Sequence, residues 1–340
     1  MKKKFLTSAL LIMLFFFSGL CRGAIDNPKL IKLPMGFGPH RIENTPFIYD
    51  GRALLIENSR LHAGVDSKHV TDMYIIDLTT TEVICRFGEY FAYNCAYADG
   101  KELNVFASEC DGHICACADP EGRGGIYRFW SSDLKNWKKE LIIPKEKDKH
   151  WYNTSVCKTP EGYLMAYESE KPIGWCFRLA RSNDLSHWEP IKELIFADLA
   201  EGSCLANPTI RYIEPYYYAI VGIHRGKGRA AAEYKYHRTD SRYFTFVMRS
   251  KDLVMWDLSP TEYPMLEPED EDGINATDAD LFEFMGNTYI FYGAGWQDSR
   301  GTIRVKMYPG PMKECLESYF SDKVPVIKFD AQKGKYIYPK

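Results

Sequence analysis

Short apolar runs separated by turn residues dominate the chain. Three of them cover Ile126–Trp130, Phe177–Ala180 and Phe244–Met248. Runs of this length, bounded by Gly, Pro, Asn and Asp, are typical of β-strands. The sequence has no helical period of useful length, apart from a short segment near 312–319. The pattern therefore predicts an all-β fold.

A turn motif, S-x-D-L-x-x-W, follows each of these three runs. We read its copies as Ser132–Trp137, Ser182–Trp188 and Ser250–Trp256. Ser and Asp side chains close turns by bonding nearby backbone N–H groups, and Leu and Trp pack the turn down. We expect a hairpin at each copy. A turn that occurs three times cannot be one unique catalytic group, so we assign the motif a structural role.

A second repeat lies upstream of these hairpins. Five segments begin with Asn or Asp, run through apolar residues to a turn, and enter a second apolar strand. Their first residues are Asn44, Asn94, Asn153, Asn207 and Asp278. The second strands end at Glu57, Glu109, Glu168, Gly222 and Gly293. The chain therefore reads as five copies of one unit.

Each unit supplies two central strands and an outer hairpin, which is the composition of a β-propeller blade. We predict a single five-bladed β-propeller domain over residues 24–340, with blades of about four antiparallel strands. The expected blades lie near 40–84, 85–146, 147–200, 201–266 and 270–335.

The first 23 residues have the layout of a secretory signal peptide. Three lysines at 2–4 precede an apolar run, Ala9–Phe17, and small residues follow at Gly23 and Ala24. The run is too short for a permanent membrane span. We expect a secreted or periplasmic protein. Lipid anchoring at Cys21 is the less favoured alternative, because Leu20 stands where a lipoprotein signal needs a small residue.

Composition and charge limit the classes of molecule that we expect the protein to bind. The chain has 340 residues with 43 basic and 46 acidic side chains, a net charge of -3. No basic field of the kind that binds phosphate backbones follows from this balance, so we expect no nucleic-acid partner. Aromatic residues make up 14% of the chain, which suits β structure and stacking on flat ligand faces. We expect a monomer that binds carbohydrate.

The cysteines indicate neither a disulfide framework nor a metal. Ten are present, and mostly inside apolar runs, which favours buried free thiols. The cluster Cys110, His113, Cys115 and Cys117 lacks the paired spacing of a zinc site. We therefore predict no metal and no cofactor.

The propeller topology turns the repeat into a candidate site. First strands line a central channel and second strands run antiparallel to them, so the start of one and the end of the other share one face. The expected ring holds Asn44, Asn94, Asn153, Asn207 and Asp278, with Glu57, Glu109, Glu168, His224 and Trp296. Glycosidic hydrolysis needs one carboxylic acid and one carboxylate on opposite sides of the bond. The ring therefore predicts a sugar-cleaving site.

Within this ring we expect Glu168 to be the general acid and Asp278 the base or nucleophile. Glu109 and Glu57 would tune or replace them. The substrate-binding set is completed by the amides of the ring, Asn44, Asn94, Asn153 and Asn207, together with His224, Arg225, Asp280 and Trp296. Three carboxylates near these positions are off register and are expected at the rim or in solvent: Glu43, Asp50 and Glu170. In the alternative interpretation, the asparagines only tie neighbouring blades together by hydrogen bonds.

With its signal peptide, five units and hairpins at 132–137, 182–188 and 250–256, the chain resembles the five-bladed glycoside hydrolases of family 43 and their relatives in family 32. Those enzymes cleave arabinose, xylose or fructose units, so the resemblance implies a plant or algal polysaccharide substrate. Family 43 has an aspartate base on the first inner strand, where this chain has Asn44, and a mid-chain glutamate acid, for which Glu168 is the best match. Glu109 before Cys110 is similar to a family 32 pair.

Two other functions remain open from the sequence. A related glycoside phosphorylase would need cations for phosphate, which His224, Arg225 and Arg249 could supply. A non-catalytic glycan-binding propeller would keep the aromatic channel without a working carboxylate pair.

Overall fold

The computed structural model describes residues 30–37, 41–59, 72–110, 124–146, 149–169, 171, 176–198, 203–224, 242–260, 263–269, 272–295, 301–320 and 326–338. The expectations for the signal peptide, Cys21, His113, Arg225 and Trp296 fall outside these residues. Within them, no helix is long and apolar enough to cross a membrane.

Three sheets each contain four antiparallel strands in chain order. The first consists of β2 (Arg41–Tyr49), β3 (Arg52–Ser59), β4 (Met73–Asp77) and β5 (Val83–Phe87). The second consists of β6 (Phe91–Asp99), β7 (Glu102–Glu109), β8 (Ile126–Ser131) and β9 (Lys138–Ile143). The third consists of β10 (Tyr152–Thr159), β11 (Gly162–Ser169), β12 (Cys176–Ser182) and β13 (Trp188–Pro190).

A larger sheet holds two further runs of strands. One is β16 (Ala206–Ile213), β17 (Tyr216–His224), β18 (Tyr243–Ser250) and β19 (Met255–Leu258), and the other is β20 (Asn275–Phe284), β21 (Asn287–Gly295) and β22 (Thr302–Tyr308). A single parallel pair, Tyr243 with Asn275, links the two runs. The short strands β14 (Ala197–Asp198) and β15 (Ser203–Cys204) pair with each other, and a short helix, α2, covers Met312–Glu317.

Both ends of the chain add strands to this larger sheet. The strand β1 (Ile31–Phe37) pairs with β22, while β23 (Ile327–Asp330) and β24 (Lys335–Ile337) extend β19. The predicted bounds of the last unit, 270–335, are therefore wrong at the C-terminal end. Its fourth strand comes from residues 31–37, whose apolar side chains pack on Phe291, Ile303 and Val305.

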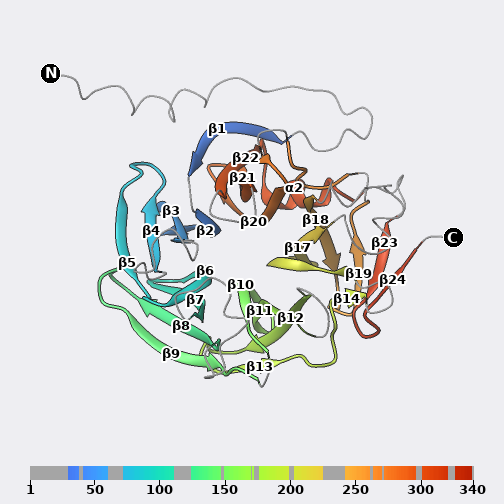
Figure 1. Ribbon diagram of the computed structural model, residues 1–340, viewed down its shortest axis with the longest axis horizontal. Coiled ribbons are helices and arrows are strands. Elements are labelled where there is room, and N and C mark those ends of the chain that lie inside the picture. The colour runs from blue at the N-terminus through green and yellow to red at the C-terminus, as the bar shows by residue number, and fades with distance from the viewer. Residues whose placement is uncertain are drawn as a thin grey trace.

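The sheets are arranged around a common centre (Figure 1). In the described part of the chain, the strands nearest to the centre are β2, β6, β10, β16 and β20, called the inner strands below. Each inner strand contacts the next, and β20 contacts β2, so the inner strands close a ring. The predicted all-β, antiparallel architecture is confirmed.

Apolar clusters fill the spaces between neighbouring sheets. Phe47, Ile56, Phe91 and Phe129 pack between the first and second sheets. Leu55 packs with residues of β21 and β22 on the other side of the first sheet. Because each sheet is buried on both faces, its strands read as unbroken apolar runs rather than as alternating patterns.

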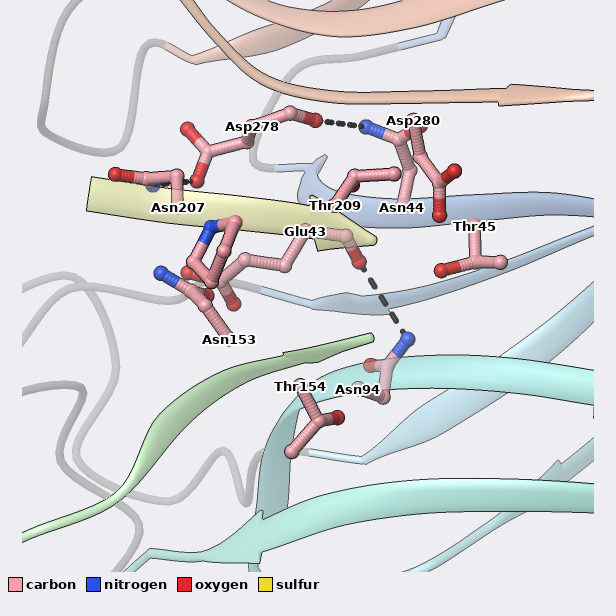
Figure 2. A pocket seen from close by; sticks show the side chains of 11 residues that line it. Glu43, Asn44, Thr45, Asn94, Asn153, Thr154, Asn207, Thr209, Asp278 and Asp280 are labelled. Atoms are coloured by element: carbon pink, nitrogen blue, oxygen red, sulfur yellow. Dashed lines mark hydrogen bonds between the residues drawn. The ribbon is translucent and has the colours of Figure 1, made fainter. Parts of the chain in front are cut away.

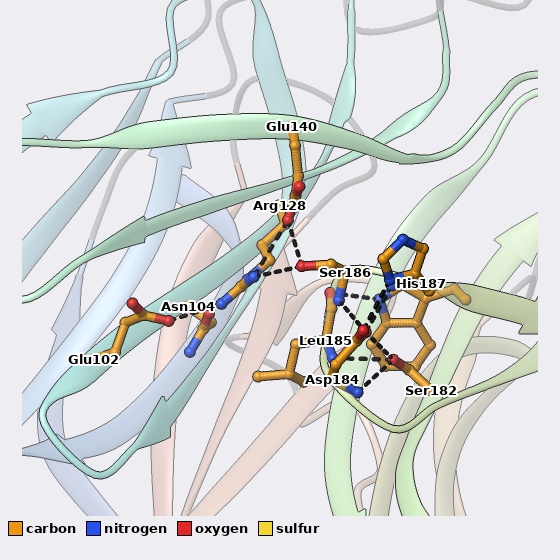
Figure 3. Close-up of polar contacts among 10 residues, drawn as sticks. Glu102, Asn104, Arg128, Glu140, Ser182, Asp184, Leu185, Ser186 and His187 are labelled. Atoms are coloured by element: carbon orange, nitrogen blue, oxygen red, sulfur yellow. Dashed lines mark hydrogen bonds and ion pairs between the residues drawn. The ribbon is translucent and has the colours of Figure 1, made fainter.

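The three predicted turns share the hydrogen bonds of their Ser and Asp side chains, and Figure 3 shows the turn at 182–188. The backbone N–H of Leu185 donates to Ser182 Oγ at 2.9 Å, that of His187 donates to Asp184 Oδ1 at 2.8 Å, and Trp188 Nε1 donates to the Leu185 carbonyl at 2.8 Å. The pattern recurs at Ser250, Asp252 and Trp256. In the first copy the serine is Ser131 and not Ser132, because Leu134 N–H donates to Ser131 Oγ.

Arg128 fixes one of these turns to the neighbouring sheet (Figure 3). Its Nε donates to Asn104 Oδ1 at 2.7 Å and its Nη2 to Glu102 Oε1 at 2.7 Å, both within the second sheet. Its Nη1 donates to Ser186 Oγ, in the turn of the third sheet, at 2.8 Å. This turn thus ties the third sheet to the second.

Replacing Asp252 by alanine removes the acceptor of the Val254 and Met255 backbone N–H groups, both at 2.9 Å. We expect a loss of about 1 kcal/mol in the free energy of unfolding, as for loss of a helix cap. Denaturant unfolding measures this loss. Lys135→Ala, at an exposed position of the equivalent turn, should leave the midpoint unchanged. An unchanged midpoint for Asp252→Ala would contradict the structural role of the turn.

Candidate functional site

A β-bulge interrupts every inner strand at the same level. Two residues of the inner strand there lie opposite one residue of the second strand. The bulged pairs are Glu43–Asn44, Tyr93–Asn94, Asn153–Thr154, Asn207–Pro208 and Asp278–Ala279.

The first residue of each bulge has a left-handed backbone conformation. The φ angles are 56° for Glu43, 58° for Tyr93, 43° for Asn153, 50° for Asn207 and 52° for Asp278. Asn and Asp accept this conformation readily, whereas it is unusual for Glu and Tyr. The equivalent positions of the five inner strands are therefore these residues. The predicted alignment was off by one residue at Asn44 and Asn94.

The second strands show a similar offset. On each second strand, one residue pairs with the inner-strand residue just before the bulge. These residues are Asn58, Ser108, Glu168, Gly222 and Gly293. Glu57 and Glu109 each stand one residue away from this position, and neighbouring residues of a strand point to opposite faces. Glu57 is fully buried and Glu109 lies beside Tyr127, whose pKa it helps to raise. Neither lines the central cavity.

Side chains from all the inner strands line a small polar cavity at the centre (Figure 2). Its volume is about 30 Å³, and it is partly open rather than enclosed. The cavity is lined by Glu43, Asn44, Thr45, Asn94, Asn153, Thr154, Asn207, Pro208, Thr209, Asp278 and Asp280.

Six of the predicted site residues lie in this lining: Asn44, Asn94, Asn153, Asn207, Asp278 and Asp280. His224 ends β17, and the structure describes its backbone but not its side chain. Glu43 was expected at the rim or in solvent, and this expectation is wrong. It is 7% exposed and lines the cavity, as do Asn153, Asn207 and Asp278 at the first positions of their bulges, whereas Tyr93 does not.

Glu168 lies directly behind two cavity residues. It is 2% exposed, and it accepts hydrogen bonds from Asn153 Nδ2 and from the Asn207 backbone N–H. Burial raises the pKa of its carboxyl group to about 8, the hydrogen bond from Asn153 opposes this, and the charges of Asp278 and Glu43 add to it. Glu168 therefore holds its proton at neutral pH.

Asp278 is placed in the cavity wall by neighbours on both sides (Figure 2). Asn207 Nδ2 donates to its Oδ1, and Thr277 Oγ donates to its Oδ2 at 2.9 Å. The Asp278 carboxylate is thus oriented by an amide and a hydroxyl.

Asp280 lines the cavity but is already paired. It forms an ion pair with Arg211 Nη2 and accepts the Leu281 backbone N–H at 2.6 Å. Burial raises the pKa of Asp280, and the Arg211 charge opposes that rise. Arg211 also donates to the carbonyls of Ile210 and Leu281. This ion pair joins β16 to β20 at the cavity.

The second residue of three bulges ties its strand to the preceding inner strand. Asn44 Nδ2 donates to the Asp278 carbonyl at 3.4 Å, and Asn94 Nδ2 donates to the Glu43 carbonyl at 3.5 Å. The single proton of the Thr154 hydroxyl lies between the Phe106 carbonyl of β7, at 2.9 Å, and the Tyr93 carbonyl of β6, at 3.2 Å. For Asn44 and Asn94, the interpretation as ties between sheets is therefore the one that their contacts support.

A metal centre is not found within the described residues, since none of their His, Cys, Asp and Glu side chains form a group that could hold an ion. The predicted cluster around Cys110 extends into residues that the structure does not describe.

Comparison with known proteins finds similarity at the level of fold. No family model and no curated protein sequence matches the chain. A β-1,2-mannobiose phosphorylase from Listeria innocua matches with a TM-score of 0.55 and 14% identity, over 87% of this chain and 95% of the other. A GH43 endo-arabinanase from Bacillus licheniformis matches with a TM-score of 0.51 and 10% identity, over 88% and 98%.

A GH32 β-fructofuranosidase from Bombyx mori matches with a TM-score of 0.51 and 15% identity, over 82% of this chain and 62% of the other. The expected resemblance to families 43 and 32 is confirmed for the fold, and the low identities agree with divergent catalytic motifs. This chain has the fold of propeller enzymes that act on glycosides.

Proposed function

We propose that this protein is a glycoside hydrolase that cleaves plant or algal polysaccharide or oligosaccharide at the central cavity. The observation that carries the proposal is the convergence of Glu43, Glu168 and Asp278 at the bulges, with Glu168 protonated at neutral pH. Glycosidic hydrolysis uses such a set, a carboxylic acid with a raised pKa and an ionised carboxylate. The similarity in fold to GH43 and GH32 enzymes supports the same reaction class.

In this mechanism Glu168 donates its proton to the leaving oxygen, and Asp278 activates water or attacks the sugar carbon. The two groups are close enough for the charge of Asp278 to raise the pKa of Glu168. Without substrate, Glu168 borders the cavity through Asn153 and Asn207. Hydrogen bonds of catalytic groups often reach their working geometry only with substrate bound. Glu43 is the third carboxylate of the site. Glu109 is left out because it stands one residue away from the strand position that Glu168 occupies.

We further infer that the fold is a five-bladed propeller. The ring of inner strands, each with its bulge, supports this blade count. With residues 1–23 as a signal peptide, we propose that the protein acts outside the cytoplasm, as a monomer on a carbohydrate substrate.

The similarity to a mannobiose phosphorylase raises a second candidate function. Phosphorolysis needs cations that hold phosphate. Arg249 does not supply one at the cavity, because it pairs with Glu317 and lies 4.2 Å from the ring of Phe320. Arg211 is paired with Asp280. The described cavity lining contains neither Lys nor Arg, and the side chains of the other two candidate cations, His224 and Arg225, lie outside the described part of the chain.

Incubation with a panel of aryl glycosides and plant polysaccharides, with and without phosphate, tests the proposal. Release of free sugar without phosphate is the expected result. Turnover that requires phosphate would make the protein a phosphorylase. Binding without turnover of any member would make it a glycan-binding propeller.

Replacing Glu168 by glutamine removes the proposed acid. We expect turnover to fall by about 10²- to 10⁴-fold, the range for loss of a general acid. The activity of the unaltered protein should fall as the pH rises through about 8, where Glu168 loses its proton. Glu57→Gln is the matched control, because Glu57 is equally buried but stands one residue off register. Full activity of Glu168→Gln would reject the acid role.

Replacing Asp278 by asparagine keeps the shape of the side chain but removes its charge. We expect a loss of at least about 10²-fold in turnover, because neither a base nor a nucleophile remains at that position. The anomeric configuration of the first product, followed by NMR, then shows whether Asp278 acts as nucleophile with retention or as base with inversion. Unchanged turnover would remove Asp278 from the mechanism.

A further inference from the structure

We propose that Asn153 is a positioning residue that orients the Glu168 carboxyl group and weakens its hold on the proton. Only one part of this inference rests on the proposed function, namely the effect of the contact on proton transfer to a substrate. The contact itself is a property of the folded protein, because Asn153 Nδ2 donates directly to Glu168 Oε2.

The backbone places the Asn153 amide for this contact. Asn153 is the first residue of the bulge in β10, with a φ of 43°, a conformation that asparagine tolerates better than most residues. Tyr152, the residue before it, pairs with Glu168 across the sheet. The bulge therefore brings the amide of Asn153 beside the carboxyl group of Glu168 while both remain part of one sheet.

The groups around Glu168 act in opposite directions. Asp278 from β20 and Glu43 from β2 are the charged groups that face it, and both favour the protonated form. Asn153 from β10 and the Asn207 backbone N–H from β16 donate hydrogen bonds, which favour the ionised form. Of these four, Asn153 Nδ2 is the side-chain donor. A protonated carboxyl group without it would be a weaker acid, and so slower to transfer its proton.

The next inner strand repeats this arrangement with another carboxylate. Asn207, in the equivalent bulge position with a φ of 50°, donates its Nδ2 to Asp278 Oδ1. Adjacent bulges thus give each proposed catalytic carboxyl group one amide. The Asn207 side chain contacts Asp278, while its backbone N–H, which a glycine variant keeps, donates to Glu168. A variant of this side chain therefore separates the two effects.

The variant Asn153→Gly removes the amide and keeps a residue that accepts the left-handed backbone. The titration of Glu168 is followed by NMR on protein labelled with carbon-13 in the glutamate carboxyl groups, and its signal is identified by its absence in Glu168→Gln. We expect a midpoint of about 8 in the unaltered protein. In Asn153→Gly it should rise by about one pH unit, since a hydrogen bond to a charged group is worth about that much.

The alkaline limb of turnover should move upward by the same amount in Asn153→Gly. Asp50→Gly is the matched control, because Asp50 is exposed in a turn with a φ of 49° and lies outside the cavity lining. Asp50→Gly should change neither the midpoint of the Glu168 titration nor the midpoint of the alkaline limb. Asn207→Gly should shift the alkaline limb less than Asn153→Gly does. The isosteric Asn153→Asp serves if the glycine variant does not fold. Its expected shift is larger, because it adds a negative charge.

An unchanged Glu168 midpoint in these Asn153 variants would overturn the inference, whatever their turnover. A raised midpoint in a protein that cleaves no glycoside would uphold the inference and reject the proposed function. The two failures are therefore distinguishable.

Discussion

The β-bulge of the inner strands is the constraint on which the site depends. In a regular strand the residues at 43, 153, 207 and 278 would alternate with their neighbours, and their side chains would not meet at the centre. The extra residue gives each of them a left-handed conformation and turns Glu43, Asn153, Asn207 and Asp278 toward one cavity. The same bulges provide the second-position donors that join adjacent inner strands. The bulges therefore determine both the positions of the cavity side chains and the hydrogen bonds that join the inner strands.

Burial then converts this geometry into chemistry. The apolar clusters between the sheets exclude water from both faces of every sheet. A carboxyl group such as Glu168, placed at the end of a second strand, loses its hydration, and its proton becomes hard to remove. Asp280 lies in a similarly buried place, but Arg211 compensates its charge. The two carboxyl groups differ in the presence of a cation, and we therefore propose a catalytic role for Glu168 and a structural role for Asp280.

Much of the fold could be predicted from local patterns, and the turn motif with its Ser, Asp, Leu and Trp was read correctly apart from Ser131. The pairing of residues 31–37 with β22 could not, since it depends on contacts between the two ends of the chain. For the site, Asn153, Asn207 and Asp278 were aligned correctly. Glu43 was missed because Asn44 imitates the repeat one residue later. Aligning the small polar residues two positions on, Thr45 with Thr209, would have given the right register.

The central claim is that the fold holds one carboxyl group, Glu168, in its protonated form. The pH dependence of the free energy of unfolding tests it most directly. Between the ordinary value of 4.5 and about 8, the folded state binds the proton of Glu168 and the unfolded state does not, so stability should fall as the pH rises through this range. In Glu168→Gln this fall should be largely absent. An equal fall in both proteins would contradict the account.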